Sequence, residues 1–265
     1  MRSILFSIGP FHVYGYGFMI ALGVIFAFVI GCRLAKKIGL DDDTLFSMGL
    51  IGVAGGLVGA KLLYYIVELP EILKNPSILL QVGEGFVVYG GLIAGFLTPV
   101  FYARKKKISF FAYLDCAVVG VSVAQGFGRI GCFLAGCCYG METSAWYGVV
   151  FPIDSLAPSK VSLIPTQLIS AAGDFVIGII LFILHGIFYK NANDKASGKL
   201  SAIYLMLYAA GRFFIEFLRG DPRGNVGILS TSQFIAIFMF TAGAILLAKV
   251  SNKFIENKDK ENKKC

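Results

Sequence analysis

The sequence predicts an all-α integral membrane protein with about seven transmembrane helices. Of its 265 residues, 57% are hydrophobic and 15% are charged, whereas a soluble domain carries about 25% charged residues. The mean hydropathy is +0.75. Apolar runs recur along the chain, each close to the roughly 20 residues that cross a bilayer as a helix.

Seven runs meet this length, and we take them in chain order. They are expected at 13–35, 45–67, 86–103, 111–136, 164–188, 200–218 and 228–250. The first run is too long for the apolar part of a signal peptide and lacks a clear cleavage site, so it is predicted to be a span. Residues 1–250 then form one domain, and the charged tail at 251–265 is expected to be disordered.

Basic residues fall in alternate connections between these spans. The richer set follows the first, third, fifth and seventh spans and includes Arg33, Lys36, Lys37, Arg104, Lys105, Lys106, Lys107, Lys190, Lys195 and Lys199. Because Lys and Arg concentrate in cytoplasmic loops, the N-terminus is predicted outside and the C-terminus in the cytoplasm. The formal charge of +8 is typical of such loops, so a nucleic-acid partner is not expected.

With this topology, polar and aromatic side chains from five or six spans meet at one depth near the outer leaflet. The residues concerned are Tyr14, Tyr16, Lys61, Tyr89, Arg129, Thr166, Gln167, Arg212, Glu216 and Arg219. Scattered structural polar residues would not be expected to converge in this way. The convergence predicts a cavity that opens toward the outer leaflet.

The fourth span ends in the motif at 128–140, Gly-Arg-Ile-Gly-Cys-Phe-Leu-Ala-Gly-Cys-Cys-Tyr-Gly. An arginine is costly inside a bilayer and needs a partner. Arg129 has no acidic residue within a helical turn of its own span, so another span, a carbonyl group or an anionic ligand must meet its charge. Small residues such as Gly128 let a ligand or a second backbone approach closely.

The sixth span carries Arg212 and Glu216 four residues apart, on one helix face, with Arg219 on a similar face. The pair could be an ion pair that fixes helix packing. Alternatively, Glu216 holds one arginine while the others present guanidinium groups to a phosphate, which arginine binds through two parallel hydrogen bonds.

Lys61, Tyr89, Gly90 and Gly91 belong to the second and third spans. Lys61 could extend its ammonium group to the interface or add positive charge to the site. Tyr89 could be an interfacial anchor. Gly90 and Gly91 also permit a break at the start of the helix, which would turn the Tyr89 hydroxyl and backbone N–H groups toward a ligand.

The cysteines of the motif allow two interpretations. Cys132 and Cys137 near Arg129 could have lowered thiol pKa values and be nucleophilic, or they could be small apolar fillers. Metal binding through Cys132, Cys137 and Cys138 is a further, less favoured possibility, because the sequence offers no obvious fourth ligand and the six cysteines do not form regular metal-binding pairs. The sequence therefore predicts neither a metal site nor a cofactor.

These residues resemble the bacterial prolipoprotein diacylglyceryl transferase family, whose signature is Gly-Arg-x-Gly-Asn-Phe-x-Asn-x-Glu-x-x-Gly. Gly128, Arg129, Gly131, Phe133 and Gly140 match it. The resemblance covers nearly the whole chain. It also includes the segments at 7–10, 16–19, 90–93 and 165–168 and the Tyr-x-x-x-Arg-x-x-x-Glu-x-x-Arg pattern of Tyr208, Arg212, Glu216 and Arg219.

The resemblance implies transfer of diacylglycerol from phosphatidylglycerol to the lipobox cysteine of a preprolipoprotein at the bacterial plasma membrane. It implies that Arg129 and Arg212 hold the phosphate, that Glu216 orients Arg212, and that Tyr16 lines the site. Lys61, Gly90, Gly91, Gly128, Cys132, Gln167, Tyr208 and Arg219 are the expected substrate-binding residues, and Arg129, Arg212, Glu216, Tyr89 and Cys137 are the expected catalytic residues.

The chain departs from the family pattern at chemically important positions. Tyr89 stands in place of histidine, Cys132 and Ala135 in place of two asparagines, and Cys137 in place of glutamate. Two alternatives therefore stay open. The chain could be a paralogue that serves another acceptor, with Cys137 as a covalent carrier, or a lipid-binding or transport protein without chemistry.

Overall fold

A computed structural model describes residues 4–8, 11–80, 83, 85–153, 155–189, 198–221 and 224–262. The long helices are α1 (Gly15–Lys37), α2 (Asp42–Val67), α4 (Val88–Lys106), α5 (Phe110–Ala135), α6 (Thr166–Phe188), α7 (Lys199–Ile215) and α8 (Thr231–Asn262). Short helical elements are α3 (Leu69–Lys74), η1 (Pro76–Leu80) and η2 (Glu216–Leu218). Three antiparallel strand pairs complete the fold: β1 (Ile4–Ile8) with β2 (Phe11–Tyr14), β3 (Val149–Val150) with β4 (Ser162–Leu163), and β5 (Asn225–Val226) with β6 (Leu229–Ser230).

The all-α membrane fold is confirmed. In the described residues, six helices are long and apolar enough to cross a membrane: α1, α2, α5, α6, α8 and α7 continued by η2. The remaining predicted span, the third at 86–103, corresponds to α4, whose last turn carries Arg104, Lys105 and Lys106 and is therefore less apolar. The span number of seven and the orientation of the N-terminus stay predictions.

The helix ends lie close to the expected ones, with one extension. Helix α8 continues to Asn262, into the tail at 251–265 for which disorder was expected. A helix that has already formed in the span can add residues without a new nucleation step. The domain boundary at residue 250 stays a prediction.

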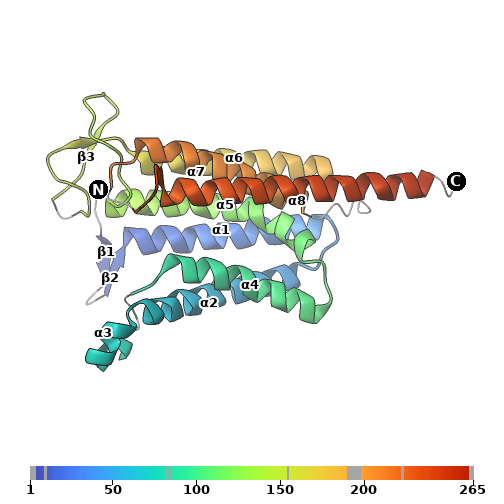
Figure 1. Ribbon diagram of the computed structural model, residues 1–265, viewed down its shortest axis with the longest axis horizontal. Coiled ribbons are helices and arrows are strands. Elements are labelled where there is room, and N and C mark those ends of the chain that lie inside the picture. The colour runs from blue at the N-terminus through green and yellow to red at the C-terminus, as the bar shows by residue number, and fades with distance from the viewer. Residues whose placement is uncertain are drawn as a thin grey trace.

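The helices form a larger bundle with an attached pair (Figure 1). The most extensive contacts are those of α1 with α5, α5 with α6, α7 with α8, and α2 with α4. Strands β1, β2 and β3 and helix α3 lie at one end of the molecule, which we call the loop end, and the C-terminus lies beyond the opposite end. The last turns of α1 and α4 are basic, and they point away from the loop end, as Figure 1 shows.

Helices α2 and α4 pack backbone against backbone through glycines. A Cβ atom added to Gly59 would lie 2.6 Å from the carbonyl oxygen of Gly90, and one added to Gly90 would clash with the carbonyl oxygen of Gly59. A Cβ atom on Gly91 would lie 3.2 Å from the carbonyl oxygen of Gly56. Gly90 and Gly91 therefore serve close helix packing in this structure.

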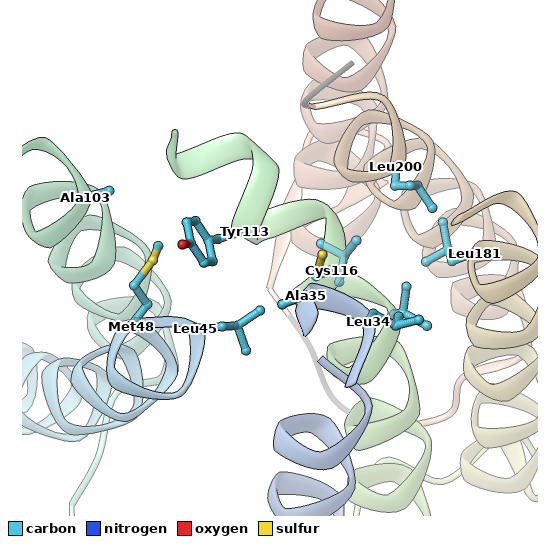
Figure 2. Close-up of a cluster of buried hydrophobic side chains, with 11 residues drawn as sticks. Leu34, Ala35, Leu45, Met48, Ala103, Tyr113, Cys116, Leu181 and Leu200 are labelled. Atoms are coloured by element: carbon cyan, nitrogen blue, oxygen red, sulfur yellow. The ribbon is translucent and has the colours of Figure 1, made fainter. Parts of the chain in front are cut away.

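A buried apolar cluster joins the pair to the bundle (Figure 2). Leu45 and Met48 of α2 and Ala103 of α4 meet Tyr113 and Cys116 of α5 in this cluster. Figure 2 also shows Leu34 and Ala35 of α1, Leu181 of α6 and Leu200 of α7, which extend the cluster along α5. These contacts hold the attached pair against the bundle near the basic last turn of α4.

Candidate functional site

A cavity of about 290 Å³ lies between α5, α6 and α7. Its polar side chains are Arg129 of α5, Ser170 and Asp174 of α6, and Tyr208 and Arg212 of α7. The rest of the wall is glycine or apolar, with Phe214, Ile215 and Leu218 among its residues. The structure therefore brings three of the predicted site residues, Arg129, Tyr208 and Arg212, into one cavity.

Glu216 and a serine of α8 hold Arg212 in place. The Arg212 Nη1 atom lies 2.6 Å from the Glu216 Oε2 atom, and Arg212 Nη2 donates a hydrogen bond of 2.7 Å to Ser232 Oγ. The side chains of Arg212 and Glu216 are only 13% and 5% exposed. Two partners from different directions fix the plane of this guanidinium group at the cavity wall.

Arg129 meets its charge partners across helices, as its lack of an acidic neighbour in sequence predicted. It interacts electrostatically with Tyr208 and Asp174, the first on α7 and the second on α6. Asp174 is only 5% exposed, and its backbone carbonyl accepts a hydrogen bond of 2.7 Å from Ser122 Oγ. When all four groups are ionised, the positive charges of Arg129 and Arg212 equal the negative charges of Asp174 and Glu216. A bound phosphodiester would then add one negative charge to a site whose net charge is zero.

Three motif cysteines form a second group at the end of α5, which we call the thiol cluster. The Sγ atoms of Cys132, Cys137 and Cys138 all lie within 4.8 Å of one another. Gly136 ends the helix in the left-handed region, with a φ of 76°, a conformation that glycine adopts readily. The turn carries Cys137 back over the helix, where its N–H donates a hydrogen bond of 3.1 Å to the Cys132 carbonyl oxygen.

The start of α6 fixes the thiol-cluster turn from behind. Thr166 Oγ1 donates a hydrogen bond of 2.8 Å to the Cys138 carbonyl oxygen, and Gln167 Nε2 donates one of 2.8 Å to the Cys137 carbonyl oxygen. Both side chains are 1% exposed. Gln167, predicted as a substrate-binding residue, thus positions the backbone of the motif. Its buried Oε1 atom accepts no hydrogen bond from the residues that the structure describes.

Arg219 closes the other side of the thiol cluster. It donates paired hydrogen bonds of 2.8 and 2.9 Å to the two carboxylate oxygens of Asp221, and it also hydrogen-bonds the Cys138 thiol. Hydrogen bonds from the Cys132 and Cys137 thiols, followed by that from Arg219, hold the pKa of the Cys138 thiol well below its usual range.

Tyr16 links the two groups from the first turn of α1. Its ring contacts the position of Gly131, where an added Cβ atom would lie 3.2 Å from the Tyr16 Cδ2 atom. It lies within electrostatic range of Arg129 and of all three thiols of the cluster. The ring is 45% exposed and so is open to a ligand or to lipid, in keeping with its predicted place beside the site.

Other predicted site residues lie on the attached α2–α4 pair and do not line the cavity. Tyr89 is 51% exposed in the first turn of α4. The Lys61 Nζ atom lies 5.0 Å from the ring centroids of both Tyr64 and Tyr65, within cation–π range.

Gly128 lies on α5, with no atom within 4 Å of an added Cβ, which leaves open space beside Arg129.

Sequence reasoning did not assign Asp174, Ser170 or Ser232 to the site. Asp174 carried the clearest signal, because a carboxylate at mid-depth of an apolar span needs a cationic partner. Ser170 lies one helical turn before it, on the same face. Ser232 carried no signal beyond an ordinary hydroxyl at a helix start, whereas Thr166 was among the polar residues expected near the outer leaflet.

The family relationship follows from sequence comparison. A sequence model described as prolipoprotein diacylglyceryl transferase matches residues 3–249. Over 243 residues, 92% of this chain and 95% of the relative, the chain is 45% identical to a phosphatidylglycerol–prolipoprotein diacylglyceryl transferase of Clostridium tetani. It is 45% identical to transferase 2 of Clostridium perfringens over 247 residues (93% and 94% of the two chains) and 33% identical to transferase 1 of that organism over 250 residues (93% and 94%). The chain belongs to the prolipoprotein diacylglyceryl transferase family.

Proposed function

We propose that this protein transfers the diacylglyceryl group of phosphatidylglycerol to the lipobox cysteine of a prolipoprotein. The observation that carries the proposal is the cavity in which Arg129 and Arg212 face an apolar wall. This combination suits a lipid whose headgroup is an anionic phosphodiester. The relatives at 45% identity bear the name of this reaction, and so does transferase 1 at 33%.

The two arginines would bind the phosphodiester through charge-assisted hydrogen bonds. Arg212 is oriented for this by Glu216 and Ser232. Arg129 has the Asp174 carboxylate within electrostatic range, and the Arg212 guanidinium is already oriented before the lipid arrives. Preorganised donors of this kind are most effective where negative charge develops in the transition state.

The reaction breaks the bond between the glyceryl carbon and the phosphate oxygen. The acceptor thiol releases its proton to solvent, its sulfur forms the new carbon–sulfur bond, and glycerol phosphate leaves with the electron pair of the broken carbon–oxygen bond. The phosphate gains one negative charge in this step. Arg129 and Arg212 would stabilise that charge, and Tyr208 adds a hydroxyl to the same wall of the cavity.

The position of the protein in the cell forms part of the proposal. Alternating basic connections favour an N-terminus outside and a C-terminus in the cytoplasm, and a bacterial plasma membrane suits the substrate pair. In this orientation the loop end, with the thiol cluster and the start of α6, faces the outer side. A prolipoprotein signal peptide would then present its lipobox cysteine near the leaflet that holds the cavity.

A transfer assay tests the proposal. The purified protein, in nanodiscs that contain phosphatidylglycerol, is incubated with a lipobox peptide, and the products are identified by mass spectrometry. We expect a peptide that carries one diacylglyceryl group on its cysteine, and no product from a peptide with serine at that position. Intact phosphatidylglycerol and unmodified peptide, with lipid bound to the protein, would overturn the proposal and favour a lipid-binding role.

A further inference from the structure

The thiol cluster has a chemical composition that the phosphate-binding cavity does not explain. Cys132, Cys137 and Cys138 contribute three soft donor atoms within 4.8 Å of one another. None of the three lines the cavity, and all three are half-buried cysteines outside any disulfide. Soft thiolate donors that converge in this way select zinc or monovalent copper over hard cations.

We propose that Cys132, Cys137 and Cys138 bind a zinc ion as three thiolate ligands and that the fourth coordination position receives the thiolate of the acceptor cysteine. Three protein ligands with one open position are the arrangement of catalytic rather than structural zinc sites. The metal-binding part stands on the geometry of the thiol cluster, and the identity of the fourth ligand rests on the proposed function.

The spacing of the sulfur atoms suits zinc. With Zn–S bonds of about 2.3 Å, two sulfur ligands of a tetrahedral ion lie about 3.8 Å apart. The observed upper limit of 4.8 Å needs only small side-chain rotations to reach that value. The backbone that carries two of the ligands is already fixed, because Thr166 and Gln167 hold the carbonyl groups of Cys138 and Cys137.

The surrounding charges suit an anionic zinc complex. A zinc ion with three thiolates carries a net charge of −1, and a fourth thiolate makes it −2. Arg219 already hydrogen-bonds Cys138, and Arg129 lies within electrostatic range of Cys132 and Cys138. Outer partners of this kind hold and tune metal ligands, so the two arginines would compensate the charge that the thiolates bring.

The thiol cluster also lies where an acceptor thiol is needed. Arg129 both lines the cavity and neighbours the thiol cluster, so a zinc-bound acceptor would face the bound phospholipid. On binding zinc, the acceptor thiol releases its proton to solvent. Its thiolate then forms the carbon–sulfur bond as the carbon–oxygen bond breaks, the electron pair leaves on glycerol phosphate, and the thioether dissociates from the metal.

Metal analysis tests the thiol cluster without any lipid. The protein, loaded with Zn²⁺ and passed over a desalting column, should retain about one zinc ion per chain, and Cys138→Ser should retain at least tenfold less. Cys32→Ser, which removes a half-buried thiol of α1 outside the thiol cluster, should bind like the parent protein. Equal zinc retention by the parent protein and Cys138→Ser would overturn the proposal.

A labelling experiment tests zinc binding by the same three cysteines without any substitution. Zn²⁺ should protect Cys132, Cys137 and Cys138 from a maleimide reagent, read by peptide mass spectrometry, while the labelling of Cys32 stays unchanged. Labelling of all three at the same rate with and without Zn²⁺ would contradict metal binding. So would the recovery of two of the three as a disulfide from protein that is kept under Zn²⁺ in air.

Cobalt substitution tests the fourth ligand. Co²⁺ in the thiol cluster should give the visible bands of a tetrahedral thiolate site, and a lipobox peptide should shift them, whereas the peptide with serine should not. Bands that the cysteine peptide leaves unchanged would overturn the assignment of the fourth ligand. Because this spectrum needs no phospholipid, failure of the transfer assay would count against the proposed function and leave the metal site standing.

Discussion

The guanidinium group of Arg212 and the carboxylate of Glu216 form a buried ion pair, with Nη1 and Oε2 2.6 Å apart. The pair spans the junction between α7 and η2 at the wall of the cavity. Burial of two charges stabilises a protein little by itself, but removal of one partner leaves an uncompensated charge. The pair therefore fixes the position of Arg212 and makes the protein sensitive to the loss of Glu216.

Substitution of Arg212 by lysine should separate charge from geometry. Lysine keeps the positive charge but cannot donate the planar pair of hydrogen bonds. We expect kcat/KM for phosphatidylglycerol to fall about 10²–10³-fold, the cost of losing one preorganised donor, with the thermal unfolding temperature nearly unchanged. Activity within twofold of the parent protein, measured by peptide diacylation, would show that Arg212 only fixes the helices.

Glu216→Gln should lower the free energy of unfolding more than the loss of an exposed ion pair does. It removes the carboxylate that compensates the buried Arg212 guanidinium, and breaking such a pair costs about 3–5 kcal/mol. The control is Glu71→Gln, which removes the Glu71–Lys74 pair whose side chains are 55% and 74% exposed. Equal changes in the free energy of unfolding for both variants would contradict the structural role of Glu216.

Asp174→Asn should strengthen the response of the protein to anionic lipid. The substitution keeps the size of the side chain and leaves Arg129 without its carboxylate partner, so a phosphodiester becomes a larger part of its charge compensation. A ligand that binds the folded state raises the unfolding temperature by mass action. We expect phosphatidylglycerol, compared with phosphatidylcholine, to raise that temperature more in the variant than in the parent protein, and an equal rise in both would refute the pairing.

Gly59→Ala should loosen the α2–α4 pair. The added methyl group would lie 2.6 Å from the Gly90 carbonyl oxygen and would also clash with Ala94, and overpacking of this kind costs about 1–3 kcal/mol. Gly186→Ala is the matched control, because no atom lies within 4 Å of its added Cβ. Thermal unfolding should show a fall for Gly59→Ala alone, and a fall of the same size in both variants would disprove the packing role.

Asp115→Asn should destabilise the contacts at the start of α7 without changing lipid recognition. The buried Asp115 carboxylate accepts hydrogen bonds of 2.6 Å from Tyr189 and of 2.7 and 2.8 Å from the N–H groups of Gly198 and Ser201, at the start of α7. The NH2 group of an asparagine would face these donors in place of a carboxylate oxygen, and each group left without a partner costs about 1–3 kcal/mol of stability. We expect a lower unfolding temperature and an unchanged KM for phosphatidylglycerol, whereas a raised KM would place Asp115 in the site.

Apolar runs and basic connections were enough to predict the membrane fold. The spans at 13–35, 111–136 and 164–188 correspond to α1, α5 and α6 within a few residues, because an unbroken apolar run of that length has no other stable arrangement in a bilayer. The pairing of these helices could not be predicted in the same way. It depends on contacts between segments that are distant in the sequence, such as the close backbone approach of Gly59 and Gly90.

Only part of the candidate site could be predicted, because its remaining contacts also depend on how distant segments pack. Arg129 and Arg212 were found because charges inside apolar spans are costly and therefore conspicuous. The partner of Arg129 was not found, since Asp174 lies 45 residues further along the chain and only the packing of α6 on α5 brings it near. Gln167 was read as a ligand contact, yet its amide holds the motif backbone, an arrangement that depends on the turn at Gly136.

The most direct test of the central claim is a product balance with phosphatidylglycerol labelled in both glycerol units. The purified protein, the labelled lipid and a lipobox peptide are incubated, and the thioether peptide and free glycerol phosphate are counted together by mass spectrometry. The account predicts equal amounts of the two products, one diacylglyceryl unit per peptide, and loss of both when Arg129 is replaced by lysine. Release of glycerol phosphate without the peptide thioether, or no release at all, would contradict it.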